Sequence, residues 1–151
     1  MTAFGALLAH GVGFGDATLL ATRLAVGGFF VVSGVHKLFN PTRRQDLHAT
    51  LAADGVTYAP MMYLVPLAEL FGGLGVGFGA LTIVAAAGLV MLCIGAIALD
   101  GSKRIPAMKP LDPLDRVDDV LYLPEVLYVV CLLAPISFGP GAYSLDRLVW
   151  R

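Results

Sequence analysis

The residues that could do chemistry in this chain lie inside otherwise apolar segments. The stretch 61–99 holds one charged side chain, Glu69. A carboxylate in such surroundings needs a cation, a hydrogen-bond donor or water beside it. Ser33, His36 and Lys37 are spaced i, i+3 and i+4, so in a helix they would share one face. An imidazole or an ammonium group beside a carboxylate is suited to proton exchange with a small ligand.

A second polar group lies near the start of the last apolar segment. Glu125 stands there between Tyr122 and Tyr128. If four helices alternate in direction, Glu69 and Glu125 lie in the same leaflet, at roughly 8 to 12 Å from the loop side, given a rise of about 1.5 Å per residue. We therefore expect one polar cluster, formed by Ser33, His36, Lys37, Glu69, Tyr122, Glu125 and Tyr128.

This cluster has two interpretations. In the first, Lys37 and Glu69 form an ion pair that holds two helices together, and Glu125 binds a tyrosine or Arg104. In the second, the cluster lines a pocket in which a quinone head group, a proton or a small polar ligand meets the acids and the histidine. The sequence leaves both open.

Several cofactors do not fit the residue pattern. Bis-histidine haem needs two facing imidazoles, and only His36 lies in an apolar segment. His36 with Glu69 and Glu125 makes a weak metal candidate, so we expect no metal site. Cys93 and Cys131 lack CxxC spacing and differ in expected depth by roughly 7 Å, which disfavours a disulfide. Nothing indicates a covalently bound cofactor.

Membrane-spanning helices must position these side chains. The chain has 151 residues, of which 58% are hydrophobic, and its mean hydropathy is +0.81. Residues 1–151 therefore fit a single integral membrane domain. Because the backbone must satisfy its own hydrogen bonds in lipid, the fold class is all-α, a transmembrane four-helix bundle with up-down-up-down topology. The expected spans are about 17–39, 61–78, 81–99 and 120–138.

The connections between the spans carry their own signals. Asn40 and Pro41 predict an N-cap and a first helical position, and Asp54-Gly55 predicts a stop. We expect a short interfacial helix over residues 41–53, on the membrane surface. The polar, proline-rich segment 100–119 is expected to lack regular structure.

The charge distribution predicts orientation. Seven of the ten Lys and Arg residues fall in the connections after the first and third spans: Lys37, Arg43, Arg44, Lys103, Arg104, Lys109 and Arg116. These connections should be cytoplasmic, and both termini extracytoplasmic. The lipid bilayer is therefore the first partner of the chain, and a net charge of -1 gives no indication of nucleic-acid binding.

A buried cation is expected near the opposite face. Arg23 lies inside the first span and needs an anion. The glycines and proline at 139–141 end the last span and turn the chain back, which would bring Asp146 toward Arg23. We expect these two residues to form a structural ion pair, in contact directly or through Tyr143 or Ser144 and water; the alternative is that Arg23 extends to a lipid phosphate.

The second span contains closely spaced glycines. In the sequence GGLGVGFG, Gly73 with Gly77 and Gly75 with Gly79 have GxxxG spacing. Such a surface lets two helix backbones approach each other. We interpret it as packing within the chain, with a homodimer as the alternative.

Three sequence features together resemble the DoxX family of small four-helix integral membrane proteins. They are RLAVGGFFVVSGVHKL at 23–38, the pattern P-x-x-E-L-x-G-G at 66–73, and GPGAYSLD at 139–146. By this resemblance, the positions that recur in the family are Arg23, Lys37, Glu69, Gly73, Gly139, Gly141, Ser144 and Asp146. Members often have a histidine near the end of the third helix, where this chain has Asp100.

The resemblance also implies a function. The family is named after the membrane component of a thiosulfate:quinone oxidoreductase. It implies a quinone-linked membrane component of a redox complex in a bacterial or archaeal cell membrane, working with other subunits rather than as a self-sufficient enzyme. The alternatives are a structural or assembly subunit without ligand chemistry and, less favoured, a small-molecule carrier, since four spans without an inverted repeat rarely form an alternating-access path.

Overall fold

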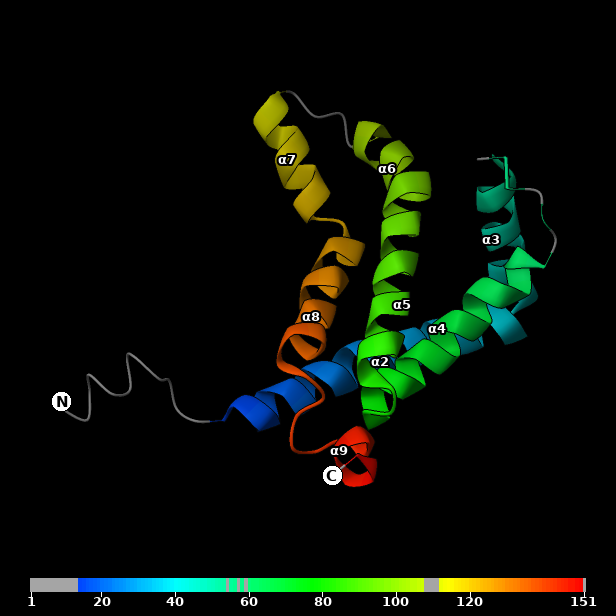
Figure 1. Cartoon of the computed structure of the whole chain (residues 1–151). Helices are drawn as coiled ribbons and strands as arrows, with labels where there is room; N and C mark the ends of the chain where they lie inside the picture. Colours follow the sequence, from blue (N-terminus) through cyan, green and yellow to red (C-terminus); the bar gives the residue numbers. More distant parts are fainter. Residues whose placement is uncertain (1–13, 54, 57, 59, 108–111, 151) are drawn as a thin grey trace.

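The computed structural model describes residues 14–150 except 54, 57, 59 and 108–111, and within this part the regular elements are helices, with no strand (Figure 1). The expectation of an all-α chain is confirmed. In chain order the helices are α2 (Gly15–Phe39), α3 (Pro41–Ala53), α4 (Met61–Phe78), α5 (Thr82–Ala96), the π-helix η1 (Ile97–Gly101), α6 (Ser102–Ala107), α7 (Pro113–Leu121), α8 (Pro124–Phe138) and α9 (Leu145–Val149).

Three of the helical stretches are long and apolar enough to cross a membrane. They are α2, α4 and the continuous stretch Thr82–Gly101 formed by α5 and η1. The pair α7 and α8 passes the same test only if it is taken as one span bent by 58°. The described part of the chain thus contains three candidate spans, or four if this bent pair counts as one.

The fourth predicted span, 120–138, contains a break near its start, between the end of α7 at Leu121 and the start of α8. The structure starts α8 at Pro124, because Leu123 is extended at φ -68° and ψ 122°. A residue before proline is sterically driven out of the helical region, and an apolarity window does not detect this break. As a result α8 has only 15 residues.

The two connections behave differently from each other. The helix expected over 41–53 is α3, with the same bounds, and the Oδ1 atom of Asn40 accepts hydrogen bonds from the amides of Thr42 at 3.0 Å and Arg43 at 3.4 Å. Of the expected stop at Asp54-Gly55, Asp54 lies outside the described residues, whereas Gly55 has φ +77° and donates its amide to the Ala52 carbonyl where α3 ends. The expectation of no regular structure over 100–119 is wrong. Asp112 caps α7 by accepting from Leu114 at 2.8 Å, with proline at the first helical position.

Glycines bring α2 and α4 into close contact. A Cβ atom on Gly27 would lie 2.6 Å from the Gly73 carbonyl oxygen and 2.8 Å from the Gly77 nitrogen. Seven residues on, a Cβ on Gly34 would lie 2.6 Å from the Pro66 oxygen, so the two helices run antiparallel. The interpretation of the glycine repeat as packing within the chain is confirmed for Gly73 and Gly77.

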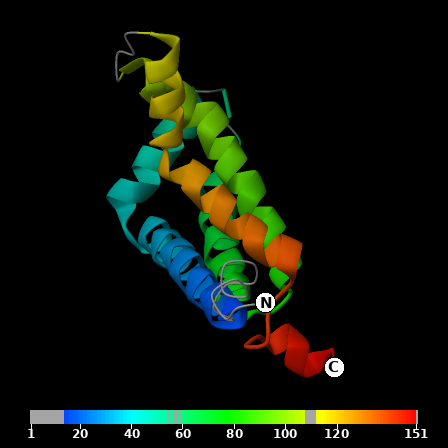
Figure 2. The same cartoon turned by 90° about the vertical axis from the view of Figure 1, so that its left-hand side faces the viewer.

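The core lies where α5 packs between α4 and α8. It consists of Val26, Phe30, Val76, Ala86, Leu89, Cys93 and Leu132, and both Cys93 and Cys131 are free thiols. Figures 1 and 2 agree that α3, α6 and α7 lie at one end of the molecule and α9 at the other. These are named the α3 end and the α9 end below.

Candidate functional site

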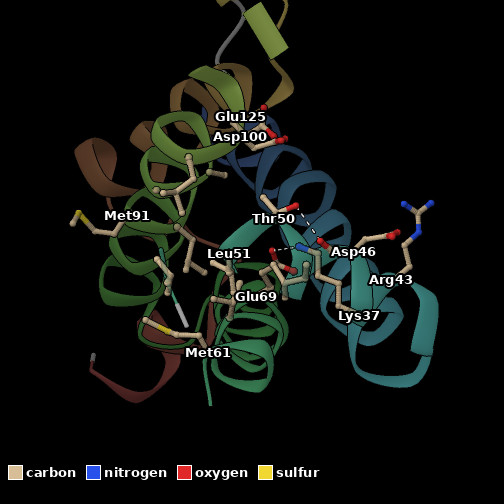
Figure 3. Close-up of a pocket in the computed structure, with 17 residues that line it drawn as sticks. Lys37, Arg43, Asp46, Thr50, Leu51, Met61, Glu69, Met91, Asp100 and Glu125 are labelled. Atoms are coloured by element: carbon tan, nitrogen blue, oxygen red, sulfur yellow. Dashed lines mark hydrogen bonds and ion pairs between the residues drawn. The ribbon is translucent and has the colours of Figure 1, made fainter. Parts of the chain in front are cut away.

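A buried ion pair joins α2 to α4 at the α3 end. Lys37 Nζ lies 2.5 Å from Glu69 Oε1, and Ser33 donates its hydroxyl to Glu69 Oε2 at 3.0 Å. Figure 3 shows the Lys37 and Glu69 side chains pointing toward each other, with Arg43 pointing away. The Glu69 side chain is 9% exposed and that of Lys37 27%. Both carboxylate oxygens of Glu69 are thus satisfied within the chain.

A second ionic group connects η1, α6 and α8. Arg104 Nη2 donates to Glu125 Oε1 at 2.7 Å, and Arg104 Nε lies 2.8 Å from Asp100 Oδ2. The π-helical turn positions Asp100 one turn before Arg104; such turns are common at functional sites. The other oxygen of Glu125, Oε2, is buried and has no hydrogen-bond partner among the described residues. Of the two bonds weighed for Glu125, the structure shows the one to Arg104.

Two residues of the expected cluster lie elsewhere. His36 is exposed on α2 and lines neither cavity described below. An i, i+3, i+4 set covers a wide arc, and the face that contacts α4 passes through Ser33 and Lys37, which turns His36 outward. Tyr122, at the break before α8, is 74% exposed. Tyr128 is half-buried, its ring centroid 4.3 Å from that of Phe29.

The two acids line two adjoining cavities. The larger has a volume of about 580 Å³ and lies between α3, α4, α5 and η1 (Figure 3). The smaller, of about 130 Å³, reaches toward Ser33 and Tyr128. Lys37, Glu69 and Glu125 line both. The larger cavity therefore has an ionic wall, and Arg43, Asp46 and Asp100 add further charge to its lining. The rest of its surface is largely apolar, formed by Leu47, Leu51, Val56, Met61, Val65, Met91, Leu92 and Leu99.

The contribution of α3 was not predicted. The sequence predicts only that this helix lies on the membrane surface, whereas its residues Leu47, Thr50 and Leu51 line the cavity. Their one-turn spacing marks an apolar face without saying what covers it. The exposed His36 also removes the nitrogen ligand of the metal set considered above, and in the described residues no group of three His, Cys, Asp or Glu side chains could hold a metal ion.

The α9 end holds a different arrangement. Arg23, 1% exposed, donates to the carbonyl oxygens of Pro140 and Tyr143, the latter at 2.5 Å. Asp146 accepts instead from the amides of Leu81 at 2.7 Å and Thr82 at 2.8 Å and from the Thr82 hydroxyl at 2.7 Å. The tail does fold back over Arg23. Of the two expected forms of contact, the direct ion pair with Asp146 is absent among the described residues, and Arg23 binds the tail through the carbonyl groups of Tyr143 and Pro140.

Asp146 holds the start of α5 in place. Burial disfavours its charged form, but the hydrogen bonds from Thr82 and Leu81, aided by the Arg23 charge, outweigh burial and lower the pKa of this carboxyl. Beside it Gly79 has φ +71°, and a Cβ there would lie 2.6 Å from Ser144 Cβ. The tail therefore fits tightly onto the turn between α4 and α5.

An all-helical chain with three or four apolar helices of spanning length and a buried ion pair between the first two is typical of an integral membrane protein. The DoxX family model matches residues 18–100, more than half of the chain, so the chain belongs to the DoxX family. The match includes Arg23, Lys37, Glu69 and Gly73 but not the tail at 139–146. A search of the curated proteins found no match, and neither did a search of the solved structures.

Proposed function

We propose that this protein is a quinone-linked membrane component of a redox complex, and that it works with other subunits rather than as an enzyme by itself. One observation carries the proposal: the cavity of about 580 Å³ has apolar walls and one ionic wall formed around Lys37, Glu69 and Glu125. Membership of the DoxX family supports the same assignment.

The cavity suits an amphiphilic ring. Its volume falls within the range of roughly 300 to 1,000 Å³ typical of small-molecule sites. Lys37 has further N–H groups beyond the one directed at Glu69, so it can donate to a quinone carbonyl. Met61 and Met91 belong to both the cavity lining and the outer surface, Met91 being 68% exposed. A lipid-soluble ligand could therefore enter from the bilayer.

The arrangement in the membrane is part of the proposal. We place α2, α4, α5 with η1, and α8 with part of α7 as four alternating spans of a cell membrane. The excess of Lys and Arg at the α3 end then puts this end in the cytoplasm and both termini outside. In this arrangement the cavity opens at the cytoplasmic half of the bilayer.

Copurification tests the proposal. The full chain, purified in mild detergent from its native membrane, should retain quinone in its lipid extract, measured by chromatography and mass spectrometry. A bulky substitution on the cavity wall, Leu92→Trp, should reduce this quinone content, whereas Leu133→Trp on the exposed face of α8 should not. Equal amounts of quinone per mole of detergent in the wild type, in both variants and in protein-free micelles would contradict the proposal.

A structural or assembly role is the second candidate, and α7 supports it. Leu114, Val117 and Leu121 recur along this helix and are 78%, 58% and 63% exposed. An apolar stripe on a helix that also carries acidic residues suits a protein partner. A stoichiometric partner that copurifies without quinone and is lost in Leu114→Ser with Val117→Ser would favour this role.

A further inference from the structure

The four carboxylate oxygens of Glu69 and Glu125 are not equivalent. Glu69 Oε1 accepts from Lys37, Glu69 Oε2 from Ser33, and Glu125 Oε1 from Arg104. Glu125 Oε2 is buried and lacks a partner among the described residues. A buried acceptor without a donor is unfavourable, so a donor that reaches this atom gains more than an ordinary hydrogen bond.

The local side chains leave this atom to a ligand. Arg104 is held by Glu125 Oε1 on one side and Asp100 on the other. Tyr128 lines the smaller cavity with Glu125, but contacts with Phe29 at 4.3 Å and Phe30 at 5.7 Å fix its ring. Glu125 also lines the larger cavity, where the proposed ligand would lie, and a rotation of its carboxylate would bring Oε2, which is closed to solvent without a ligand, to that cavity. The group that matches Oε2 is therefore a hydroxyl or N–H carried by the ligand.

We propose that the site selects the reduced form of its ligand, a hydroquinone, over the corresponding quinone, and that Glu125 determines this selectivity. The inference rests on the proposed function, because it assumes that the ligand is a quinoid. A hydroquinone hydroxyl donates to Glu125 Oε2 and can also accept from Lys37. A quinone carbonyl accepts only, so it can meet Lys37 but not Glu125.

A ligand series on the unaltered protein tests this selectivity. The full chain in lipid nanodiscs, kept anaerobic, is titrated with a short-chain benzohydroquinone, the matching benzoquinone and the dimethyl ether of the hydroquinone. The ether keeps the ring and both oxygens but has no hydroxyl proton. We expect the hydroquinone to bind at least about tenfold more tightly than either of the others, the usual size of a hydrogen bond to a charged group.

A pair of variants tests the assignment to Glu125. In Glu125→Gln an amide replaces the carboxylate and offers N–H groups where the free oxygen stood, so the preference for the hydroquinone should fall to about threefold or less. Asp118→Asn is the matched control, because it removes the same charge from α7 at an exposed position that lines neither cavity. Its selectivity should equal that of the wild type.

The outcomes separate the inference from the function on which it rests. Equal affinities for all three ligands would overturn the inference and leave a quinone site in place. No binding of any of them would reject the proposed function itself. A Glu125→Gln protein that folds and keeps the full preference would show that another residue sets it, and if this variant does not fold, the ligand series on the wild type still decides the selectivity.

Discussion

Removing the two members of the Lys37–Glu69 pair one at a time should have unequal effects. Lys37→Met leaves Glu69, whose side chain is 9% exposed, with Ser33 as its remaining donor. An uncompensated buried charge typically costs about 3 to 5 kcal/mol. Glu69→Gln keeps an acceptor for Ser33 and leaves Lys37, which is 27% exposed and can extend toward water. Its cost should be about 1 to 2 kcal/mol.

The double variant should be more stable than Lys37→Met alone. With both charges gone no buried ion remains, so the free energy of unfolding should return to within about 2 kcal/mol of wild type, which corresponds to a coupling energy of at least about 2 kcal/mol. Unfolding in mixed micelles can be followed by thiol labelling of Cys93, which is 3% exposed, in a Cys131→Ser background.

A matched control and two outcomes test this reasoning. Arg43→Met removes a nearby exposed cation that Figure 3 shows pointing away from the pair, and it should change stability by less than about 0.5 kcal/mol. Additive single effects, or a larger loss for Glu69→Gln than for Lys37→Met, would refute the argument. If the stable double variant keeps quinone the pair is structural, and if it loses quinone the pair belongs to the binding site.

Three further predictions concern other parts of the molecule. Gly27→Ala should lower the free energy of unfolding by about 1 to 3 kcal/mol, because its Cβ would lie 2.6 Å from the Gly73 oxygen, whereas Gly28→Ala, with nothing within 4 Å, should not. Folding lowers the pKa of Asp146, so this residue should contribute fully to the free energy of unfolding at neutral pH, and the contribution should be lost as the pH falls below 3.8, the ordinary pKa of an aspartate. The Asp146→Asn protein should therefore be less stable at pH 7, and its free energy of unfolding should depend less on pH in the acid range. A C-terminal reporter active only in the cytoplasm should be silent in cells, and a strong signal would reverse the proposed orientation.

Periodicity and composition predict most of the helical framework. The start of α3 follows from Asn40 and Pro41, and the turn between α4 and α5 falls between the two predicted spans 61–78 and 81–99. The same reasoning misses the break before α8, because the steric effect of Pro124 on Leu123 is a backbone property that averaged apolarity hides. The described part of segment 100–119 includes α6 and most of α7, and Asp112 caps α7, a local signal that low hydropathy does not reveal.

The candidate site was predictable in part. An intramembrane carboxylate and a lysine in the same leaflet of the neighbouring helix indicate an ion pair, and the structure brings Lys37 and Glu69 into contact. The sequence does not determine the rotation of α2 about its axis to better than the angle between adjacent residues, and for this reason His36 was grouped with Lys37 and Glu69. The cavity itself depends on α3 packing against α4 and η1, a long-range arrangement that no local pattern encodes.

The two polar ends use charge in different ways, and the difference bears on function. At the α9 end Arg23 and Asp146 bind main-chain groups that close turns, so no ligand could replace those partners without unfolding the tail. At the α3 end charged side chains bind one another across several helices beside a cavity, and one buried oxygen of Glu125 remains without a donor. Side-chain pairs can exchange partners when a ligand arrives. Substitutions at the α9 end should therefore act on folding, and those at Glu125 on ligand selectivity.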